Sequence, residues 1–367
     1  MPADWRKLAR ETARSYDADE VRGMWSVDWR RAREAFFEDH RAEIEAEPRR
    51  YRRRLLQANA VVYGLARRLA PPRRLVFALV LVLVVLALLE NSFSDRQSGF
   101  AFLALLVAVL ALVFLLAMEL VDKLHFKDEL VMARALQAQL VPRPLPEIGD
   151  FELAGESRVA NTVGGDFFAF EPLPGGRVVV LFGDASGHGM AAGLVMAVTH
   201  AAFRTQLRVD PAPAAVAASL NGVLCETGSA RSFFAGVCGL LEADGSFSAI
   251  VAGHPPVLKL GPDGRIVERL GTGSYPLGIR KSTVWTPQAT SVAPGETLLF
   301  HSDGLPEARG ASGEEFGDAR VEAIAARMAG ARPGELVAAM TADLDRFLGR
   351  TPADDDVSIA AIRRKTA

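Results

Sequence analysis

Two uninterrupted apolar stretches constrain this chain more than any other feature. They are Leu75–Leu89 and Phe100–Ala117, and neither contains a charged or polar residue. Because a helix rises about 1.5 Å per residue, the second stretch nearly spans a hydrocarbon core of about 30 Å. The first is slightly short, but the arginines before it can extend their charged ends to the membrane surface. A buried hairpin in a soluble protein is the alternative; we expect two transmembrane helices over residues 75–118, joined by a short loop at 90–99.

The charges beside these stretches predict their orientation. Nine arginines and no acidic residue lie between Glu47 and Arg74, and Lys123 and Lys127 follow the second stretch. Cytoplasmic flanks of membrane helices are enriched in Lys and Arg, so both flanks are expected in the cytoplasm and the loop outside. An arginine run can also be a solvated face or a nucleic-acid patch. The net charge of the whole chain is only -2, so we predict no nucleic-acid partner. The two apolar stretches and their flanks predict a multi-pass protein of the inner (cytoplasmic) membrane.

The chain then divides into four expected regions. These are a helical, arginine-rich region at 1–74, the membrane hairpin at 75–118, a linker at 119–146, and a folded domain at 147–367. No helix breaker occurs between Glu119 and Leu140, which predicts a linker helix before a proline-rich hinge. We expect this helix to pair with its copy in a homodimer, although its apolar period is too irregular for a regular coiled coil.

Region 147–367 is long enough to bury a core of its own. Apolar or alternating runs predict strands near Phe151–Val159, Phe167–Phe170, Arg177–Phe182, Phe233–Leu241, Ser246–Ala252, Glu296–His301 and Val357–Arg363. Helical patterns cover Met190–Gln206, Pro213–Thr227, Gly317–Met328 and Gly334–Leu348. Strands follow strands instead of alternating with helices, so we predict an antiparallel α+β sandwich and not a doubly wound parallel sheet.

One strand of this domain ends in a carboxylate. The run from Val178 to Phe182 reads as a fully buried strand, and Asp184 follows it, before a turn of small residues and the helix that begins at Met190. Small side chains allow the backbone to approach a bound ion or phosphate closely. Asp184 could cap the turn or bind a metal ion, and this stretch leaves both interpretations open.

Three further aspartates lie at comparable strand edges: Asp166, Asp303 and Asp355. Hard divalent cations such as Mg²⁺ and Mn²⁺ prefer oxygen ligands. Four carboxylates in one cleft would repel one another unless cations lay between them. Two such ions about 3.5–4 Å apart can generate hydroxide and orient a phosphate for in-line attack. Each motif is weak alone, because Asp-Gly is an ordinary turn, so the convergence of the four is a hypothesis.

Seven motifs occur in order along the chain: Ala135-Leu-Gln-Ala-Gln-Leu-Val-Pro142, Val163-Gly-Gly-Asp-Phe-Phe168, Gly183-Asp-Ala-Ser-Gly-His-Gly-Met-Ala-Ala192, Ala252-Gly-His-Pro-Pro256, Pro276-Leu-Gly-Ile279, Ser302-Asp-Gly-Leu-Pro-Glu-Ala308 and Asp355-Asp-Val-Ser358. Together they resemble the PPM-type serine/threonine protein phosphatases, in their bacterial SpoIIE/RsbU branch. The resemblance covers about residues 135–363 and leaves out the first 74.

The resemblance implies an αββα sandwich with two Mn²⁺ or Mg²⁺ ions between the sheets. It implies that the ligands are Asp166, Asp184, the Ala185 carbonyl, Asp303 and Asp355. Asp184 and Asp303 would serve catalysis through metal-bound water, with no side-chain nucleophile. Members of the family typically dephosphorylate phosphoserine or phosphothreonine on STAS-type anti-sigma-factor antagonists, which places the expected catalytic domain in the cytoplasm.

Two departures from the family pattern affect this assignment. Ala169 stands where the family often has an acidic residue, and three consecutive aspartates leave the register open. We align Asp355 as the ligand and Asp356 as its neighbour. Because no core ligand is lost, an active enzyme is expected. The alternative is a catalytically weak pseudo-phosphatase that acts as a membrane-anchored phosphoprotein-binding module.

The remaining polar candidates favour structural roles. His188 is expected to order its glycine turn, His254 to shape a loop, and His200 to pack on a helix face. His125 on the linker helix is not followed by any glycine-rich ATP-binding box, which argues against a sensor kinase. Ser186 is out of register for a G-x-S-x-G elbow, which argues against a serine hydrolase.

Overall fold

The structure is a computed structural model of the whole chain. It describes residue 44 and the ranges 46–93, 99–140, 145–146, 148–160, 163–187, 189–228, 232–271 and 273–366. The tryptophan-bearing N-terminal segment, most of the loop at 90–99, most of the hinge at 141–146 and His188 lie outside these residues or have undescribed side chains. The chain forms two units, Met1–His125 and Phe126–Ala367.

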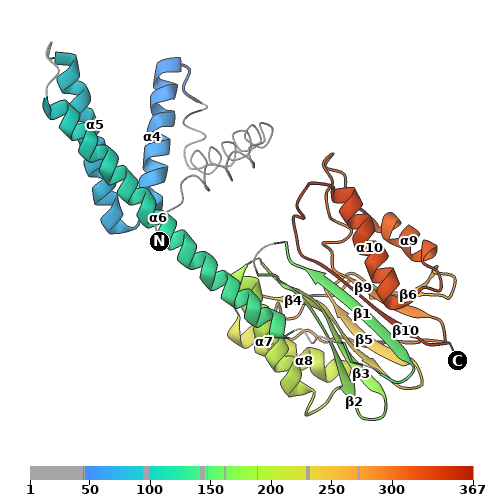
Figure 1. Cartoon of the computed structure of the whole chain (residues 1–367). Coiled ribbons are helices and arrows are strands. Elements are labelled where there is room, and N and C mark those ends of the chain that lie inside the picture. Colours follow the sequence, from blue (N-terminus) through green and yellow to red (C-terminus); the bar gives the residue numbers. More distant parts are fainter. Residues whose placement is uncertain are drawn as a thin grey trace, which may run out of the picture. The chain divides into compact units, whose positions relative to one another are not determined.

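Helices make up the described part of the first unit (Figure 1). They are α4 (Arg50–Arg68), α5 (Pro71–Phe93) and the first part of α6 (Gly99–Leu140). In both α5 and α6 a stretch is long and apolar enough to cross a membrane, at Pro71–Glu90 and Gly99–Ala135. Most of these side chains are exposed, whereas a core helix of a soluble protein would bury them. The exposure fits a membrane hairpin.

An ion-pair cluster joins α5 to α6 at the polar end of this hairpin. The Arg73 guanidinium lies 3.1 Å from a Glu119 carboxylate oxygen and 2.6 Å from one of Asp122. The linker helix predicted over Glu119–Leu140 is present, but α6 runs without a break from Gly99. The reason is local: no proline or glycine interrupts the sequence after Gly99 until Pro142.

The second unit is built on two antiparallel five-stranded sheets. The first has the order β1-β10-β9-β6-β7 and the second β2-β3-β4-β5-β8. The strands are β1 (Phe151–Arg158), β2 (Asp166–Leu173), β3 (Arg177–Ala185), β4 (Phe234–Leu241), β5 (Ser246–Ala252), β6 (Val257–Leu260), β7 (Ile266–Leu270), β8 (Gln288–Ser291), β9 (Thr297–His301) and β10 (Val357–Arg364). The helices are α7 (Met190–Gln206), α8 (Pro213–Thr227), α9 (Asp318–Arg327) and α10 (Pro333–Leu348).

The alternation of strand side chains creates three apolar layers. In β2, Phe168 and Phe170 point to the partner sheet, while Phe167 and Ala169 point to the helices. Helices α7 and α8 cover the second sheet, and α9 and α10 cover the first (Figure 1). The predicted αββα sandwich is therefore confirmed. Ala169 is fully buried under the helices, so an acidic side chain there would need a partner in an apolar layer.

Three of the ten strands in the described residues were not predicted from the sequence: β6, β7 and β8. Each has only four or five residues, and β7 and β8 are the edge strands of their sheets. The β8 segment Gln-Ala-Thr-Ser has little apolar character, and its pairing with β5 comes from the neighbouring backbone. Such strands exist because of their neighbours, so local periodicity does not reveal them.

Candidate metal centre

Asp166 and Asp184 lie directly opposite each other in the β2–β3 ladder. Side chains opposed in an antiparallel pair lie on the same face of the sheet, and like charges placed this way destabilise it. Asp166 is only 4% exposed, and its Oδ2 atom has no hydrogen-bond partner among the described residues. Burial first, and then the negative charge of Asp184, hold the pKa of the Asp166 carboxyl well above its usual range. Among the described residues, the pair therefore has no ion-pair partner of opposite charge.

Asp184 connects this pair to acids from the other sheet. Its pKa is raised to about 7, first by burial and then by the charges of Asp303, Asp355 and Asp356. Asp303 follows β9, and the other two precede β10. Sequence reasoning placed four aspartates at one cleft, and the structure brings these strand ends near one another at the edge between the sheets. Which of them bind metal stays a prediction.

The two neighbours Asp355 and Asp356 differ in what they contact. Asp356 is buried, and its Oδ1 and Oδ2 accept hydrogen bonds from the backbone N–H groups of Ala160 and Gly165, at 2.8 and 2.7 Å. Asp355 is exposed, and its Oδ1 accepts the backbone N–H of Asp356 at 2.8 Å. Both carboxylate oxygens of Asp356 thus already accept backbone hydrogen bonds that join two loops. This supports the choice of Asp355 as the ligand.

A pair of glycines allows the backbone to pass close to these oxygens. A Cβ atom on Gly165 would lie 2.4 Å from Asp184 Oδ1 and 2.5 Å from the Ala185 carbonyl oxygen. A Cβ atom on Gly164 would lie 2.4 Å from Asp356 Oδ2. Any larger residue would push the carboxylates aside. The Gly165 position therefore keeps Asp184 Oδ1 and the Ala185 carbonyl close to one point.

These donors fit a hard divalent cation. All of them are oxygens, and one buried carboxylate oxygen lacks a partner among the described residues. Burial and the charges of neighbouring acids raise the pKa of Asp166 and of Asp184. As their side chains stand, no three His, Cys, Asp or Glu residues in the described part of the chain are close enough together to hold one ion. The donor chemistry thus fits Mn²⁺ or Mg²⁺, while ligation would require the carboxylates to draw together.

Two serines that sequence reasoning did not identify lie near Asp166. Ser302 and Ser358 lower the pKa of Asp166 and partly offset the effect of burial. The two serines also bind each other, because the Ser358 backbone N–H donates to Ser302 Oγ at 2.9 Å. Both serines belong to motifs that also contain a candidate ligand, Asp303 or Asp355. This closeness in sequence could have indicated that they lie near the site.

The other polar candidates have structural roles in the described part of the molecule. Ser186 Oγ accepts the backbone N–H of Phe233 at 2.8 Å. The ring of the half-buried His254 packs edge-on against Phe182, and burial of the ring lowers its pKa to about 4, so it is neutral. His200 packs edge-on against Phe167, as expected of a packed helix face.

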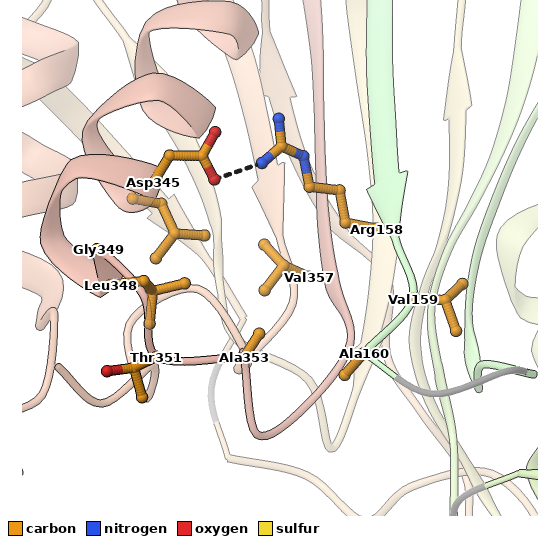
Figure 2. A pocket seen from close by; sticks show the side chains of 10 residues that line it. Arg158, Val159, Ala160, Asp345, Leu348, Gly349, Thr351, Ala353 and Val357 are labelled. Atoms are coloured by element: carbon orange, nitrogen blue, oxygen red, sulfur yellow. Dashed lines mark hydrogen bonds and ion pairs between the residues drawn. The ribbon is translucent and has the colours of Figure 1, made fainter. Parts of the chain in front are cut away.

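Two cavities flank the acidic edge, which is the edge between the sheets where Asp166, Asp184, Asp303, Asp355 and Asp356 lie. One of about 270 Å³ lies beside Asp303, and its walls include Pro255, Arg269, His301 and Glu322. The other, of about 300 Å³, lies between β1, α10 and the segment before β10, and the Arg158–Asp345 ion pair lies on its wall (Figure 2). None of the five aspartates at the acidic edge lines the second cavity. Of these two cavities, only the first is therefore lined by a candidate ligand.

Comparison with known proteins supports the same fold. A family model described as stage II sporulation protein E (SpoIIE) matches residues 174–365, just over half of the chain. The SiaA PP2C domain of Pseudomonas aeruginosa superposes with a TM-score of 0.58 and 21% identity, over 66% of this chain and 98% of that one. The RsbU and RsbW domains of a Mycobacterium tuberculosis protein superpose with a TM-score of 0.52 and 30% identity, over 62% of this chain and 64% of that one.

A similarity at the level of sequence extends further toward the N-terminus. Protein IcfG of a Synechocystis species is 24% identical over 283 residues, which are 68% of this chain and 43% of that protein. The chain thus spans less than half the length of this relative.

Proposed function

Because the chain belongs to the SpoIIE family and has its PP2C-type protein phosphatase domain, we propose that it is a metal-dependent serine/threonine phosphatase tethered to the membrane. The observation that supports this most directly is the opposed Asp166–Asp184 pair, with an unpartnered buried oxygen and with Asp303 and Asp355 acting on Asp184 from the other sheet.

The proposed division of labour follows from the described contacts. Asp166, Asp184, the Ala185 carbonyl, Asp303 and Asp355 would hold two Mn²⁺ or Mg²⁺ ions. When bound, such ions supply an activated water and neutralise the charge of the phosphate. The chain itself contributes fixed oxygens: Gly165 keeps Asp184 Oδ1 near the Ala185 carbonyl, and Ser302 and Ser358 lower the pKa of Asp166. No side chain of this site is needed as a nucleophile.

The proposed substrate is phosphoserine or phosphothreonine on a regulatory protein, of the STAS-domain antagonist type used in partner switching. A relative that combines an RsbU domain with an RsbW domain supports this choice. The cavity beside Asp303 provides room for the substrate chain next to the acids. Hydrolysis of the phosphate ester would return the antagonist to its unphosphorylated form and release inorganic phosphate.

The proposed location is the inner (cytoplasmic) membrane, with the phosphatase domain in the cytoplasm. Support comes from the two apolar helices with exposed side chains and from the arginines that precede the first of them. A homodimer through the linker part of α6 is part of the same proposal. The exposed apolar residues Leu124, Val131 and Met132 on that helix support it.

The test is phosphate release by the full chain in detergent. The substrates are a STAS-domain protein phosphorylated on serine and a phosphotyrosine peptide as control, each titrated with Mn²⁺. We expect metal-dependent release from phosphoserine only, and loss of release in Asp184→Asn. Binding of the phosphoprotein with no release at any metal concentration would instead identify a phosphoprotein-binding module.

A further inference from the structure

The linker part of α6 contacts the glycine pair through one side chain. Gln137 Nε2 donates to the Gly164 carbonyl oxygen at 2.6 Å, and the Gly164 N–H donates to Gln137 Oε1 at 3.3 Å. The side-chain amide therefore pairs with both backbone groups of one residue, as a neighbouring β-strand would. Both residues belong to the same unit, Phe126–Ala367.

The residue that Gln137 binds lies next to the candidate ligands. The adjoining Gly165 donates its N–H to Asp356 Oδ2 at 2.7 Å, and its carbonyl accepts the Ala185 N–H at 3.1 Å. Asp166 is the next residue along the chain. Gly164 is thus one peptide unit away from contacts with β3 and with the segment before β10, and two residues away from Asp166.

The space around this segment is too tight for it to shift independently. The hypothetical Cβ atoms on Gly164 and Gly165 fall within 2.4 Å of carboxylate oxygens, and one on Gly193 of α7 would lie 2.5 Å from Val163 Cγ1. A displacement of Gly164 would therefore move Gly165 against Asp184 Oδ1 and the Ala185 carbonyl. The position of the Gln137 side chain therefore affects the positions of Asp184 Oδ1 and the Ala185 carbonyl oxygen through these contacts.

We propose that Gln137 is a positioning residue, whose paired hydrogen bonds to Gly164 set the spacing of the carboxylates and thereby the affinity of the site for Mn²⁺. The inference rests on the proposed function to the extent that this site binds Mn²⁺. Gln137 touches neither metal nor substrate in this scheme.

The chemistry selects an amide at this position. Alanine would leave both Gly164 groups without their partner. Glutamate keeps the length and the acceptor for the Gly164 N–H, but its carboxylate has no proton to donate and would face the Gly164 carbonyl oxygen. Gln137→Ala and Gln137→Glu should therefore both loosen the segment around Gly164. If Gln137 only filled space, Gln137→Glu would have no effect, because the two side chains have nearly the same volume.

The test uses the full chain in detergent, with Arg134→Ala, an exposed position on the same helix, as the matched control. Titration calorimetry gives the Mn²⁺ dissociation constant, and hydrogen exchange with mass spectrometry reports on residues 163–166. For Gln137→Ala and Gln137→Glu we expect a dissociation constant raised about tenfold, the effect of one or two net hydrogen bonds. Exchange in residues 163–166 should be faster, and kcat at saturating Mn²⁺ should stay close to that of the wild type.

Two results would overturn the inference: wild-type Mn²⁺ affinity in both Gln137 variants, or an equal loss of affinity in Arg134→Ala. If Gln137→Ala does not fold, the isosteric Gln137→Glu decides alone. The outcome is separable from the proposed function. Weaker Mn²⁺ binding by the variants supports the positioning role even if the wild type releases no phosphate from a phosphoserine protein, and in that case only the phosphatase proposal fails.

Discussion

The carboxylate of Asp356 accepts a hydrogen bond from the backbone N–H of Gly165 at 2.7 Å, across 191 positions of sequence. Its other oxygen accepts the N–H of Ala160. One buried side chain thus ties the segment before β10, at the end of the chain, to the segment that leads into β2. Both segments contribute to the acidic edge between the sheets.

Asp356 and Asp355 are expected to respond differently to substitution. Asp356→Ala leaves two backbone N–H groups without partners, at a cost of about 1–3 kcal/mol for each buried group. Asp355→Asn removes an exposed charge, so the free energy of unfolding should stay within about 0.5 kcal/mol of the wild type, while phosphate release at limiting Mn²⁺ falls. Urea unfolding and a Mn²⁺ titration measure the two effects. If Asp355→Asn instead lowered stability, and Asp356→Ala lowered only phosphate release at limiting Mn²⁺, Asp356 would be the ligand.

Asp184→Asn and Asp303→Asn should each lower turnover by about two orders of magnitude or more at limiting metal, since each removes one negative oxygen ligand. Excess Mn²⁺ should partly restore turnover, because occupancy and not proton transfer is lost. Ser186→Ala is the control, since Ser186 is not a candidate ligand and its hydroxyl accepts the backbone N–H of Phe233. Wild-type turnover of Asp303→Asn at limiting Mn²⁺ would rule out Asp303 as a ligand.

Removal of metal should reverse the effect of the Asp184 substitution on stability. In EDTA the half-buried Asp184 faces other carboxylates. Burial first, and then the charges of these carboxylates, raise the pKa of Asp184 to about 7. Asp184→Asn removes this repulsion, so its melting temperature in EDTA should exceed that of the wild type by about 2–4 °C for roughly 1 kcal/mol. With Mn²⁺ the order should invert. A lower melting temperature of the variant in both conditions would contradict the repulsion.

His254 should make the second unit less stable in acid. Its Nδ1–H donates to the Pro255 carbonyl oxygen at 2.9 Å, and its buried Nε2 has no hydrogen-bond partner in the described structure, so a second proton would have no acceptor. The folded pKa of about 4 lies below an unfolded value of about 6.5. The unfolded state therefore takes up the proton first, and stability that is complete above about pH 6.5 is lost as the pH falls toward 4.

The size of this loss is about 3 kcal/mol, from about 1.4 kcal/mol for each pKa unit. His254→Asn keeps an N–H donor and does not titrate, so its free energy of unfolding should fall by about 3 kcal/mol less than that of the wild type between pH 7 and 4. Denaturant unfolding at several pH values measures this difference. Parallel pH profiles of the two proteins would show that His254 is not responsible.

The orientation of the hairpin is expected to place only its loop outside the cytoplasm. An alkaline phosphatase reporter fused after Asp95 should be active, and one fused after Lys127 inactive, because the arginines before α5 and the lysines in α6 favour the cytoplasm. A fluorescent protein at the same two positions provides the opposite readout. Cytoplasmic behaviour of the Asp95 fusion would contradict the membrane hairpin.

Most of the sandwich could be predicted from the sequence because its signals are local. In β2 and β3 both faces are buried, so β-branched and aromatic runs mark the strands, and α7 and α8 have the predicted bounds. The edge strand β8 could not be predicted this way, since it pairs with β5, which is distant in sequence. The edge strand β7 is the hairpin partner of β6, and each of these two strands is too short to give a clear local pattern. The continuity of α6 also follows from the sequence, in the absence of a helix breaker.

The sequence by itself determined which residues have the chemistry of the site: aspartates beside glycines at strand ends. Only the tertiary structure decided how they differ. It paired Asp166 with Asp184, committed Asp356 to two backbone amides, and placed the Gln137 amide on Gly164. The physical reason is that a carboxylate's pKa, burial and partners depend on chain segments up to 196 positions away, and no local pattern encodes such distances.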